Sequence, residues 1–200
     1  MTVHFKNNLL QSADLIFVIA GRENRKEYGL ELFRQGLAPR VLFSVARYEI
    51  RRFSHLSLPV PVDLLKVALD VPPPERHFFV LIEGQKVQVE HVRPGRFGTL
   101  TEIEALTHWL EDHPQIDSLL TISSETHLCR IRICCQSFLS PRLRIALIAA
   151  PDISSEKRKF ESLTAVLVER MKLLLYWAVL GVRLGWVRAN HRHRGKGTQG

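Results

Sequence analysis

Uninterrupted apolar runs alternate along the chain with segments in which apolar residues recur every three or four positions. A run such as 14–20, rich in β-branched residues, is typical of a strand covered on both faces, whereas the longer spacing is typical of a helix with one buried face. The pattern predicts strands at 14–20, 40–44, 77–82, 87–92, 118–123 and 144–149, and helices at 23–35, 99–111 and 126–138. This alternation predicts an α/β fold, a Rossmann-like, mostly parallel sheet with helices on both faces.

Three further segments complete the predicted organisation. Pro61 is positioned to begin a helix that runs to Ala68, and residues 83–86 read as the turn of a hairpin at the border of the sheet. Residues 160–186 predict an apolar C-terminal helix, whose uncharged stretch is well short of the roughly 20 residues needed to span a bilayer. We expect one α/β domain over residues 1–187 and a disordered basic tail over 188–200.

The basic character of the chain is concentrated near its C-terminal end. The formal net charge is +8, from 28 basic and 20 acidic side chains. Residues 170–200 hold 7 of the basic side chains and none of the acidic ones, which leaves 21 against 20 in the remainder. A nearly neutral body argues against specific nucleic-acid binding by the fold. The basic end instead favours a local role, such as peripheral contact with an anionic membrane surface or docking of a partner.

Cysteine usage and the N-terminal segment favour a cytoplasmic protein, with the C-terminal helix as a means of association with the inner face of the plasma membrane. Polar residues interrupt the first 14 positions, so no signal peptide is expected. Cys129, Cys134 and Cys135 are odd in number, which fits a reducing compartment. Their spacing within one predicted helix does not direct three thiolates to one centre. We therefore expect buried thiols and no metal site.

Candidate ligand-binding residues follow the strands. In open α/β sheets the loops at the carboxyl ends of the strands form the ligand crevice, where helix N-termini present unpaired N–H groups to anions. The loops and helix starts expected there contain glycine, hydroxyl, acidic and basic side chains. These are Gly21, Arg22, Ser44, Thr99, Glu102, Ser124, His127 and Arg130.

His127 and Arg130 are three residues apart at a predicted helix start, so both would project from one face near the positive end of the helix dipole. An arginine offers a fixed fork for phosphate or carboxylate, and a neutral histidine there could act as a base. The alternative is an ordinary helix start, with Ser124 or Thr126 as the N-cap and an incidental histidine. Spacing alone leaves both interpretations open.

Thr99 and Glu102 also have two interpretations. Their spacing matches the capping box, in which the two side chains satisfy backbone N–H groups at the start of a helix. In the other interpretation Glu102 belongs to the ligand site and moves protons. Gly21 could allow close approach of the backbone to a ligand, although no dinucleotide or P-loop fingerprint accompanies it.

With these residues in order, the chain resembles the uncharacterised α/β family that contains the YdcF and SanA proteins. The similar segments are 13–22, 36–44, 99–102 and 122–130, the last resembling the family signature T-S-x-x-H-x-x-R. The resemblance implies a Rossmann-like sheet with a polar crevice at its carboxyl edge. It also implies association with bacterial cell-envelope or peptidoglycan metabolism, and S-adenosylmethionine as a nucleotide-like ligand linked to the family.

Two hypotheses of different classes follow. In the first, the protein binds a small anionic or nucleotide-like molecule, with Glu102 and His127 as the proton-transfer groups if it is a hydrolase or transferase. The other six candidates would bind the ligand: Gly21, Arg22, Ser44, Thr99, Ser124 and Arg130. In the second, the protein is a non-enzymatic module whose basic, apolar C-terminal helix docks a partner or a membrane. Catalysis and oligomeric state stay open.

Overall fold

The computed structural model describes residues 12–93, 98–151 and 171. The chain divides into two units, residues 1–153 and 154–200, and the architecture below is that of the first. The predicted C-terminal helix at 160–186 and the basic tail at 188–200 lie outside the described residues, apart from Met171. Within the described segments, no helix has the length and apolar character needed to cross a membrane.

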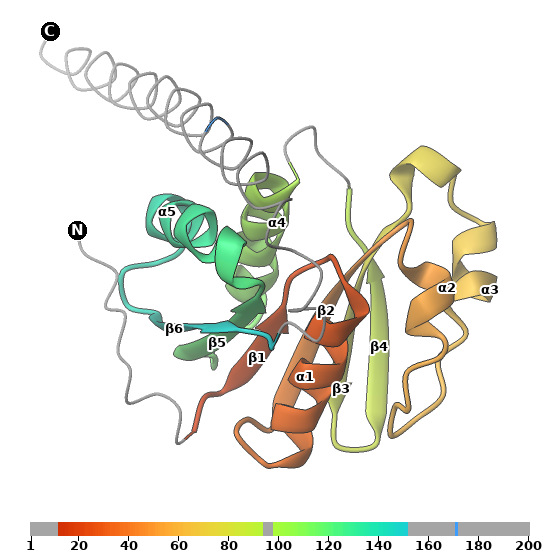
Figure 1. Cartoon of the computed structure of the whole chain (residues 1–200), viewed down its shortest axis with the longest axis horizontal. Coiled ribbons are helices and arrows are strands. Elements are labelled where there is room, and N and C mark those ends of the chain that lie inside the picture. Colours follow the sequence, from red (N-terminus) through yellow and green to blue (C-terminus); the bar gives the residue numbers. More distant parts are fainter. Residues whose placement is uncertain (1–11, 94–97, 152–170, 172–200) are drawn as a thin grey trace, which may run out of the picture. The chain divides into compact units, whose positions relative to one another are not determined.

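A six-stranded mixed sheet forms the centre of the molecule, in the order β4-β3-β2-β1-β5-β6 (Figure 1). The strands β2, β1, β5 and β6 are parallel, whereas β3 runs antiparallel to both of its neighbours. The predicted α/β class and the border hairpin are therefore confirmed. The strands are β1 Leu15–Val18, β2 Arg40–Ala46, β3 His77–Glu83, β4 Lys86–His91, β5 Ser118–Ser123 and β6 Arg144–Ala149.

The helices lie close to their predicted positions, with two corrections. The helix predicted from Pro61 begins at Leu64, because the Asp63 side chain accepts the Lys66 N–H at 3.1 Å and caps it. The helix predicted from residue 126 begins at Leu128, after a 3₁₀ turn. The elements are α1 Glu23–Arg34, α2 Ile50–Phe53, α3 Leu64–Leu69, α4 Thr99–Glu111 and α5 Leu128–Phe138, with 3₁₀ turns at Pro73–Glu75 (η2) and Glu125–His127 (η3).

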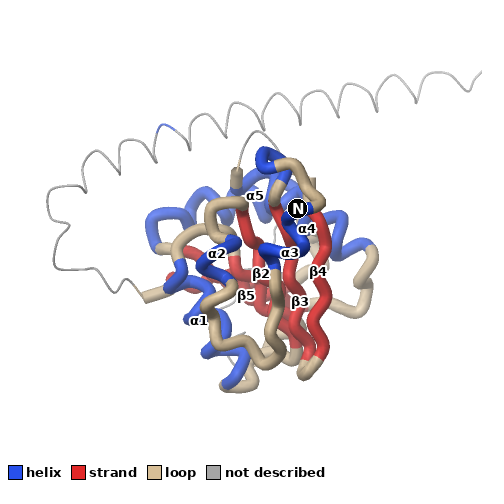
Figure 2. The backbone as a smooth tube through the Cα atoms, turned by 90° about the vertical axis from the view of Figure 1, so that its right-hand side faces the viewer, coloured by secondary structure: helices blue, strands red, loops and turns tan. Residues whose placement is uncertain are grey.

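Helices pack on both faces of the sheet, and alternation along β2 shows which face each covers. Phe43 lies under α1, where a Cβ on Gly29 would come within 2.4 Å of Val18, so only glycine allows α1 to pack this closely. The next residue, Ser44, points to the other face and bonds Glu102 of α4. Figure 2 shows the same elements from the side.

The reversed direction of β3 shapes the carboxyl edge of the sheet. Because β3 runs against β2, its first residue, His77, pairs with Ala46 at the carboxyl end of β2. A parallel strand would have brought its last residue to this place instead. The edge therefore receives a side chain from the start of a strand as well as those from the loops after β1, β2 and β5.

Candidate functional site

Charged side chains are buried together at the carboxyl edge of the sheet. Arg25, Lys26, Glu49, Glu102 and Arg130 are each between 2% and 8% exposed. Such residues are almost never fully buried unless they are paired. We call these five residues the edge cluster. They come from α1, the β2–α2 connection, α4 and the first turn of α5.

Lys26 and Glu49 form the most deeply buried ion pair of the cluster. The Lys26 Nζ lies 2.9 Å from Glu49 Oε2, which also accepts the Ala46 N–H at 3.0 Å. The other oxygen, Oε1, accepts the N–H of Gly21. Burial lowers the pKa of Lys26, and the Glu49 carboxylate opposes this effect. Glu49 therefore joins α1, the β1–α1 loop and the end of β2.

Glu102 joins the same loop to β2 from the other face of the sheet. Its Oε1 accepts the Ala20 N–H at 2.9 Å and the Ser44 hydroxyl at 2.5 Å. The residue that precedes α4 is Gly98, and Thr99 is the first residue of the helix itself. The capping-box interpretation is thus wrong, because the carboxylate of Glu102 bonds distant residues rather than the start of its own helix. Thr99, in the first turn of the same helix, is also buried.

His77 extends this hydrogen-bonded line towards solvent. Its Nε2 lies 2.7 Å from the Ser44 Oγ and 3.9 Å from Glu102 Oε1. Since the single hydroxyl proton of Ser44 goes to Glu102, the His77 Nε2–H is the donor to Ser44. Burial lowers the pKa of His77, against the opposing charges of Glu102 and Glu49, which favours the neutral ring. Ser44 is fully buried and bonded on both sides.

Arg25 bridges the ends of the two neighbouring strands β1 and β5. Its Nη1 donates to the Ala20 carbonyl at 2.8 Å, and its Nη2 donates to the Ser124 hydroxyl at 2.8 Å. Gly21 has φ +146°, and a Cβ there would lie 2.4 Å from Nη1 of Arg25. The glycine therefore makes room for the guanidinium, an internal reason for its presence that the sequence did not reveal.

Several buried polar atoms at this edge have no hydrogen-bond partner in the described part of the chain. They include the Asn24 Oδ1 and Arg25 Nε at the start of α1 and the Ser123 hydroxyl in β5. Buried polar groups in native proteins are rarely left in this state, and an ordered water or a ligand usually satisfies them. Ser123 ends β5, next to the serine that bonds Arg25. An ordered water or a bound polar molecule at this edge would satisfy these atoms.

The predicted site residues that follow β1 and β5 also lie at this edge. Arg22 is exposed and precedes α1, while Ser124 and His127 are half-buried around η3. The backbone N–H of His127 donates to the backbone carbonyl of Ser124 at 3.0 Å, so this turn fixes the backbone between the two residues. The hydroxyl of Ser124 holds Arg25 rather than capping a helix. Arg130 is buried, and its charge acts on that of Arg25.

Four functional candidates were missed by the sequence analysis: Arg25, Lys26, Glu49 and His77. A signal existed for the first two. Arg25 lies on the same side of the predicted helix as residues 29 and 32, and Lys26 lies on the same side as residues 30 and 33. Both sets of residues belong to the buried face of α1. No comparable signal marks Glu49, which lies in a segment without periodicity. His77 is placed by the reversal of β3.

The cysteines show a division that the sequence did not predict. Cys134 and Cys135 are buried, and desolvation raises the pKa of the Cys134 thiol to about 12 and that of Cys135 further still. Cys129 is exposed, which corrects the expectation of three buried thiols, because its position in the first turn of α5 faces outwards. Across residues 12–93 and 98–151, no group of three or more His, Cys, Asp or Glu side chains is arranged to hold a metal ion.

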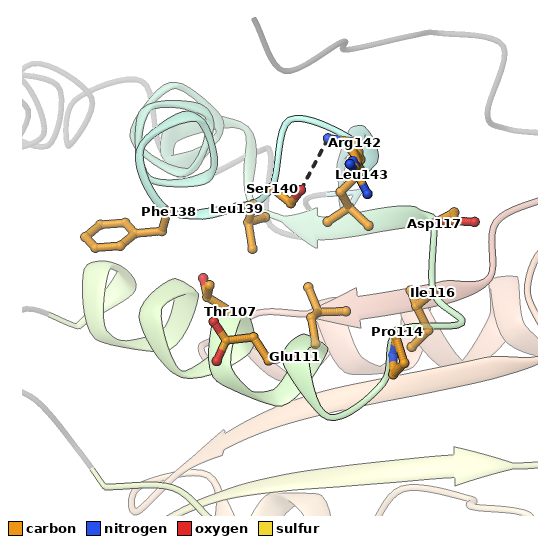
Figure 3. A pocket seen from close by; sticks show the side chains of 11 residues that line it. Thr107, Glu111, Pro114, Ile116, Asp117, Phe138, Leu139, Ser140, Arg142 and Leu143 are labelled. Atoms are coloured by element: carbon orange, nitrogen blue, oxygen red, sulfur yellow. Dashed lines mark hydrogen bonds between the residues drawn. The ribbon is translucent and has the colours of Figure 1, made fainter. Parts of the chain in front are cut away.

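Two cavities lie away from the edge cluster. One of about 400 Å³ opens near the amino ends of β5 and β6, between the C-terminal parts of α4 and α5, with Leu110, Ile116 and Leu143 in its wall (Figure 3). The other, of about 380 Å³, lies between α4 and the β3–β4 hairpin and includes Phe79 and Trp109. Neither cavity is lined by a residue of the edge cluster.

The fold and the edge cluster together define an α/β protein with a charged, hydrogen-bonded site at the carboxyl edge of a mixed sheet. Comparisons of the chain with protein-family models, with curated proteins and with solved structures give no match.

Proposed function

We propose that the carboxyl edge binds a small anion, the phosphate group of a nucleotide-like molecule above all. The observation that carries this is the charge of the edge cluster, in which three cations, Arg25, Lys26 and Arg130, face two carboxylates. Near the surface, exposed Arg22 is offset by the half-buried Glu23 and the exposed Glu125 at the neighbouring turns, so the excess of cations is that of the buried cluster itself. An excess of buried positive charge is stabilised by an anion more than by any neutral ligand.

The loop after β1 would contribute less than in dinucleotide-binding proteins. The N–H groups of Ala20 and Gly21, which would otherwise point to a phosphate, already bind the carboxylates of Glu102 and Glu49. The ligand anion would therefore lie on the β5–α5 side, near Ser124 and Arg130. Arginine is well suited to that role because its fork matches two phosphate oxygens.

The positive charge of the edge cluster also bears on which nucleotide-like ligand would bind. S-adenosylmethionine carries a cationic sulfonium, which the buried cations would repel, whereas a phosphate complements them. We therefore rank phosphate-bearing ligands above S-adenosylmethionine, the compound to which the family resemblance points. ADP and S-adenosylmethionine share an adenosyl group, so a direct comparison of these two separates the contribution of charge.

A thermal-shift titration tests the proposal with inorganic phosphate, ADP and S-adenosylmethionine as the probes. We expect ADP and phosphate to raise the Tm of the wild-type chain, and S-adenosylmethionine to raise it less. In Arg130→Gln the phosphate-dependent rise should be lost, while Arg132→Gln, an exposed arginine in the same helix, should keep it. An unchanged shift in Arg130→Gln, with circular dichroism showing a folded protein, would refute the site.

A second candidate function, hydrolysis or transfer at a phosphate or another activated group, draws support from the line His77, Ser44 and Glu102. Along its hydrogen bonds of 2.7 and 2.5 Å, the Ser44 hydroxyl could give its proton to the buried carboxylate and take one from His77 Nε2, while the partly exposed ring takes up a proton at Nδ1. His127, the other proton-transfer candidate, lies at η3 on the β5 side. Screening phosphate esters for turnover by wild type and Glu102→Gln tests this function. Turnover that persists in the variant would exclude Glu102 from the chemistry.

Membership in the YdcF/SanA-like family, with its Rossmann-like fold, remains a proposal, and a role in bacterial cell-envelope or peptidoglycan metabolism rests on that resemblance alone. What supports it is that the four resembling segments each supply part of one edge: the loop after β1, Ser44, the start of α4, and the turn before α5. A deletion strain with normal envelope composition and antibiotic sensitivity would count against this role.

The non-enzymatic docking hypothesis concerns residues outside those described and stays a separate proposal. Sedimentation with anionic and with neutral vesicles, using the full chain and a form lacking residues 188–200, tests it. Vesicle binding that disappears with the tail, in a protein that no phosphate compound stabilises, would favour docking over ligand binding. Equal vesicle binding by both forms would remove the role of the basic tail.

A further inference from the structure

The outermost strand β4 presents an unused backbone edge. Within residues 12–93 and 98–151 it pairs only with β3, and it ends the sheet on that side (Figure 2). The Val92 N–H donates to the His77 carbonyl at 2.8 Å, which directs the backbone groups of even-numbered residues inwards, to β3. Those of Val87 and Val89 therefore point outwards. Such an edge is a template for another strand.

The side chains of β4 are arranged so that the strand complements itself. Lys86, Gln88 and Glu90 share one face and are exposed, and Val87 and Val89 pack on the core from the other. In an antiparallel pairing of two β4 strands about a two-fold axis at Gln88, Lys86 lies opposite the partner's Glu90, and this contact occurs twice. Shifting the register by two residues in either direction removes both contacts.

The hydrogen-bonding pattern agrees with the same register. Val87 would face the partner's Val89 with outward backbone groups on both sides, so each such pair can exchange two hydrogen bonds. Lys86 and the partner's Glu90 would form a non-hydrogen-bonded pair, the type that brings side chains closest together. Within its own chain Lys86 pairs with Glu83, whose carboxylate already binds Arg40 at 2.8 Å.

We propose that β4 pairs antiparallel with β4 of a second copy of this chain, about a two-fold axis at Gln88, and so joins two sheets into one. The occupant is a second copy rather than another protein, because an isologous contact needs a surface that complements itself and β4 supplies both charges in the required order. The opposite interpretation is that Lys86 and Glu90 keep the edge monomeric, as charges on edge strands often do.

Analytical ultracentrifugation of single and double charge reversals distinguishes these interpretations. Lys86→Glu and Glu90→Lys each place like charges opposite one another, and each should weaken dimerisation at least tenfold. The double variant K86E/E90K recreates both contacts with reversed sign and should recover most of the wild-type affinity. Lys66→Glu, at an exposed position of α3, should behave as wild type. A monomeric wild type, or a double variant as weak as the singles, would overturn the proposal.

Disulfide trapping tests the register. The two-fold axis places residue 88 opposite itself with Cα atoms about 4.5 Å apart, within the range that a disulfide bridges. In a Cys129→Ser background, which removes the exposed thiol, Gln88→Cys should form a covalent dimer under mild oxidation. Gln85→Cys, which would face the partner's His91, should not. A dimer that fails to crosslink through residue 88 uses another surface, and that result would overturn the pairing of β4.

Discussion

The two ends of the parallel strands are built in different ways. At the amino end, the Asp14 carboxylate accepts hydrogen bonds from the Ser118 hydroxyl at 2.6 Å, the Ser118 N–H at 2.8 Å and the Asp117 N–H at 3.0 Å. This joins β1 to β5 close to solvent. Partial burial acts to raise the pKa of Asp14, but these hydrogen bonds together with the charge of Arg144 outweigh it, and the pKa is lowered. At the carboxyl end the edge cluster holds both signs of charge away from water.

The difference supports the proposal that the carboxyl end is the one that binds a ligand. A hydrogen-bonded carboxylate near water is an inexpensive way to fix the register of two strands, whereas buried charges cost several kcal/mol each before pairing offsets them. Hydrophobic side chains of the same volume would often hold a fold as well. A sequence that retains five buried charges at one edge gives up stability there, which is common where a site must meet a charged ligand.

The largest effect should come from breaking the buried ion pair. Glu49→Ala leaves the Lys26 ammonium buried without its carboxylate, and the N–H groups of Gly21 and Ala46 without an acceptor. We expect a loss of about 3–5 kcal/mol in the free energy of unfolding, measured with urea at pH 7. The double variant Lys26→Met, Glu49→Gln removes both charges and should lose much less. Equal losses in the single and double variants would show that the charges are not coupled.

A smaller effect is expected at Gly21. Gly21→Ala strains a residue with φ +146° and pushes a methyl group against the Arg25 guanidinium, at a cost of about 1–3 kcal/mol. Gly36→Ala is the matched control, because that glycine has φ +77° but open space around it. We expect Gly21→Ala to cost more in urea unfolding and also to weaken the phosphate-induced rise in Tm. If the two variants lose the same stability, the position of the Arg25 guanidinium does not depend on a glycine at residue 21.

His77 should make the carboxyl edge sensitive to pH. Its pKa in the folded protein lies below the ordinary value of 6.5, mainly through burial, so the unfolded chain binds more protons below that pH. The contribution of His77 to the free energy of unfolding is therefore complete above pH 6.5 and is lost as the pH falls from there through the folded pKa. His77→Gln should flatten this decline in urea unfolding curves between pH 7.5 and 5, while His108→Gln, at an exposed position, should not. A decline of unchanged slope in His77→Gln would exclude the ring as its source.

The smallest effect is expected at the amino end. Asp14→Asn keeps an acceptor for the Ser118 and Asp117 N–H groups and removes only the charge, so we expect a loss of about 1 kcal/mol or less. Phosphate-dependent stabilisation should be unchanged. A loss as large as that of Glu49→Ala would mean that the two ends do not differ in the way described.

The sheet was predictable because each central strand must be covered on both faces and therefore appears as a continuous apolar run. The direction of β3 was not, since an apolar run looks the same whichever way the strand runs in the sheet. For the site, the positions after β1 and β5 were predictable from the general place of ligand loops in α/β folds. Glu102 was ambiguous because a capping box and a carboxylate that reaches another strand have the same spacing, and only tertiary contacts distinguish them.

The hydrogen bonds of the edge cluster connect segments that are far apart in the chain. Glu102 and Ala20 are separated by 82 residues, and Arg25 and Ser124 by 99, whereas the β3–β4 hairpin closes over a two-residue turn. Local hairpins form within microseconds, but contacts between distant segments require the whole topology to be in place. The edge cluster is therefore expected to assemble in the last stage of folding, so its ligand would recognise only the completely folded chain.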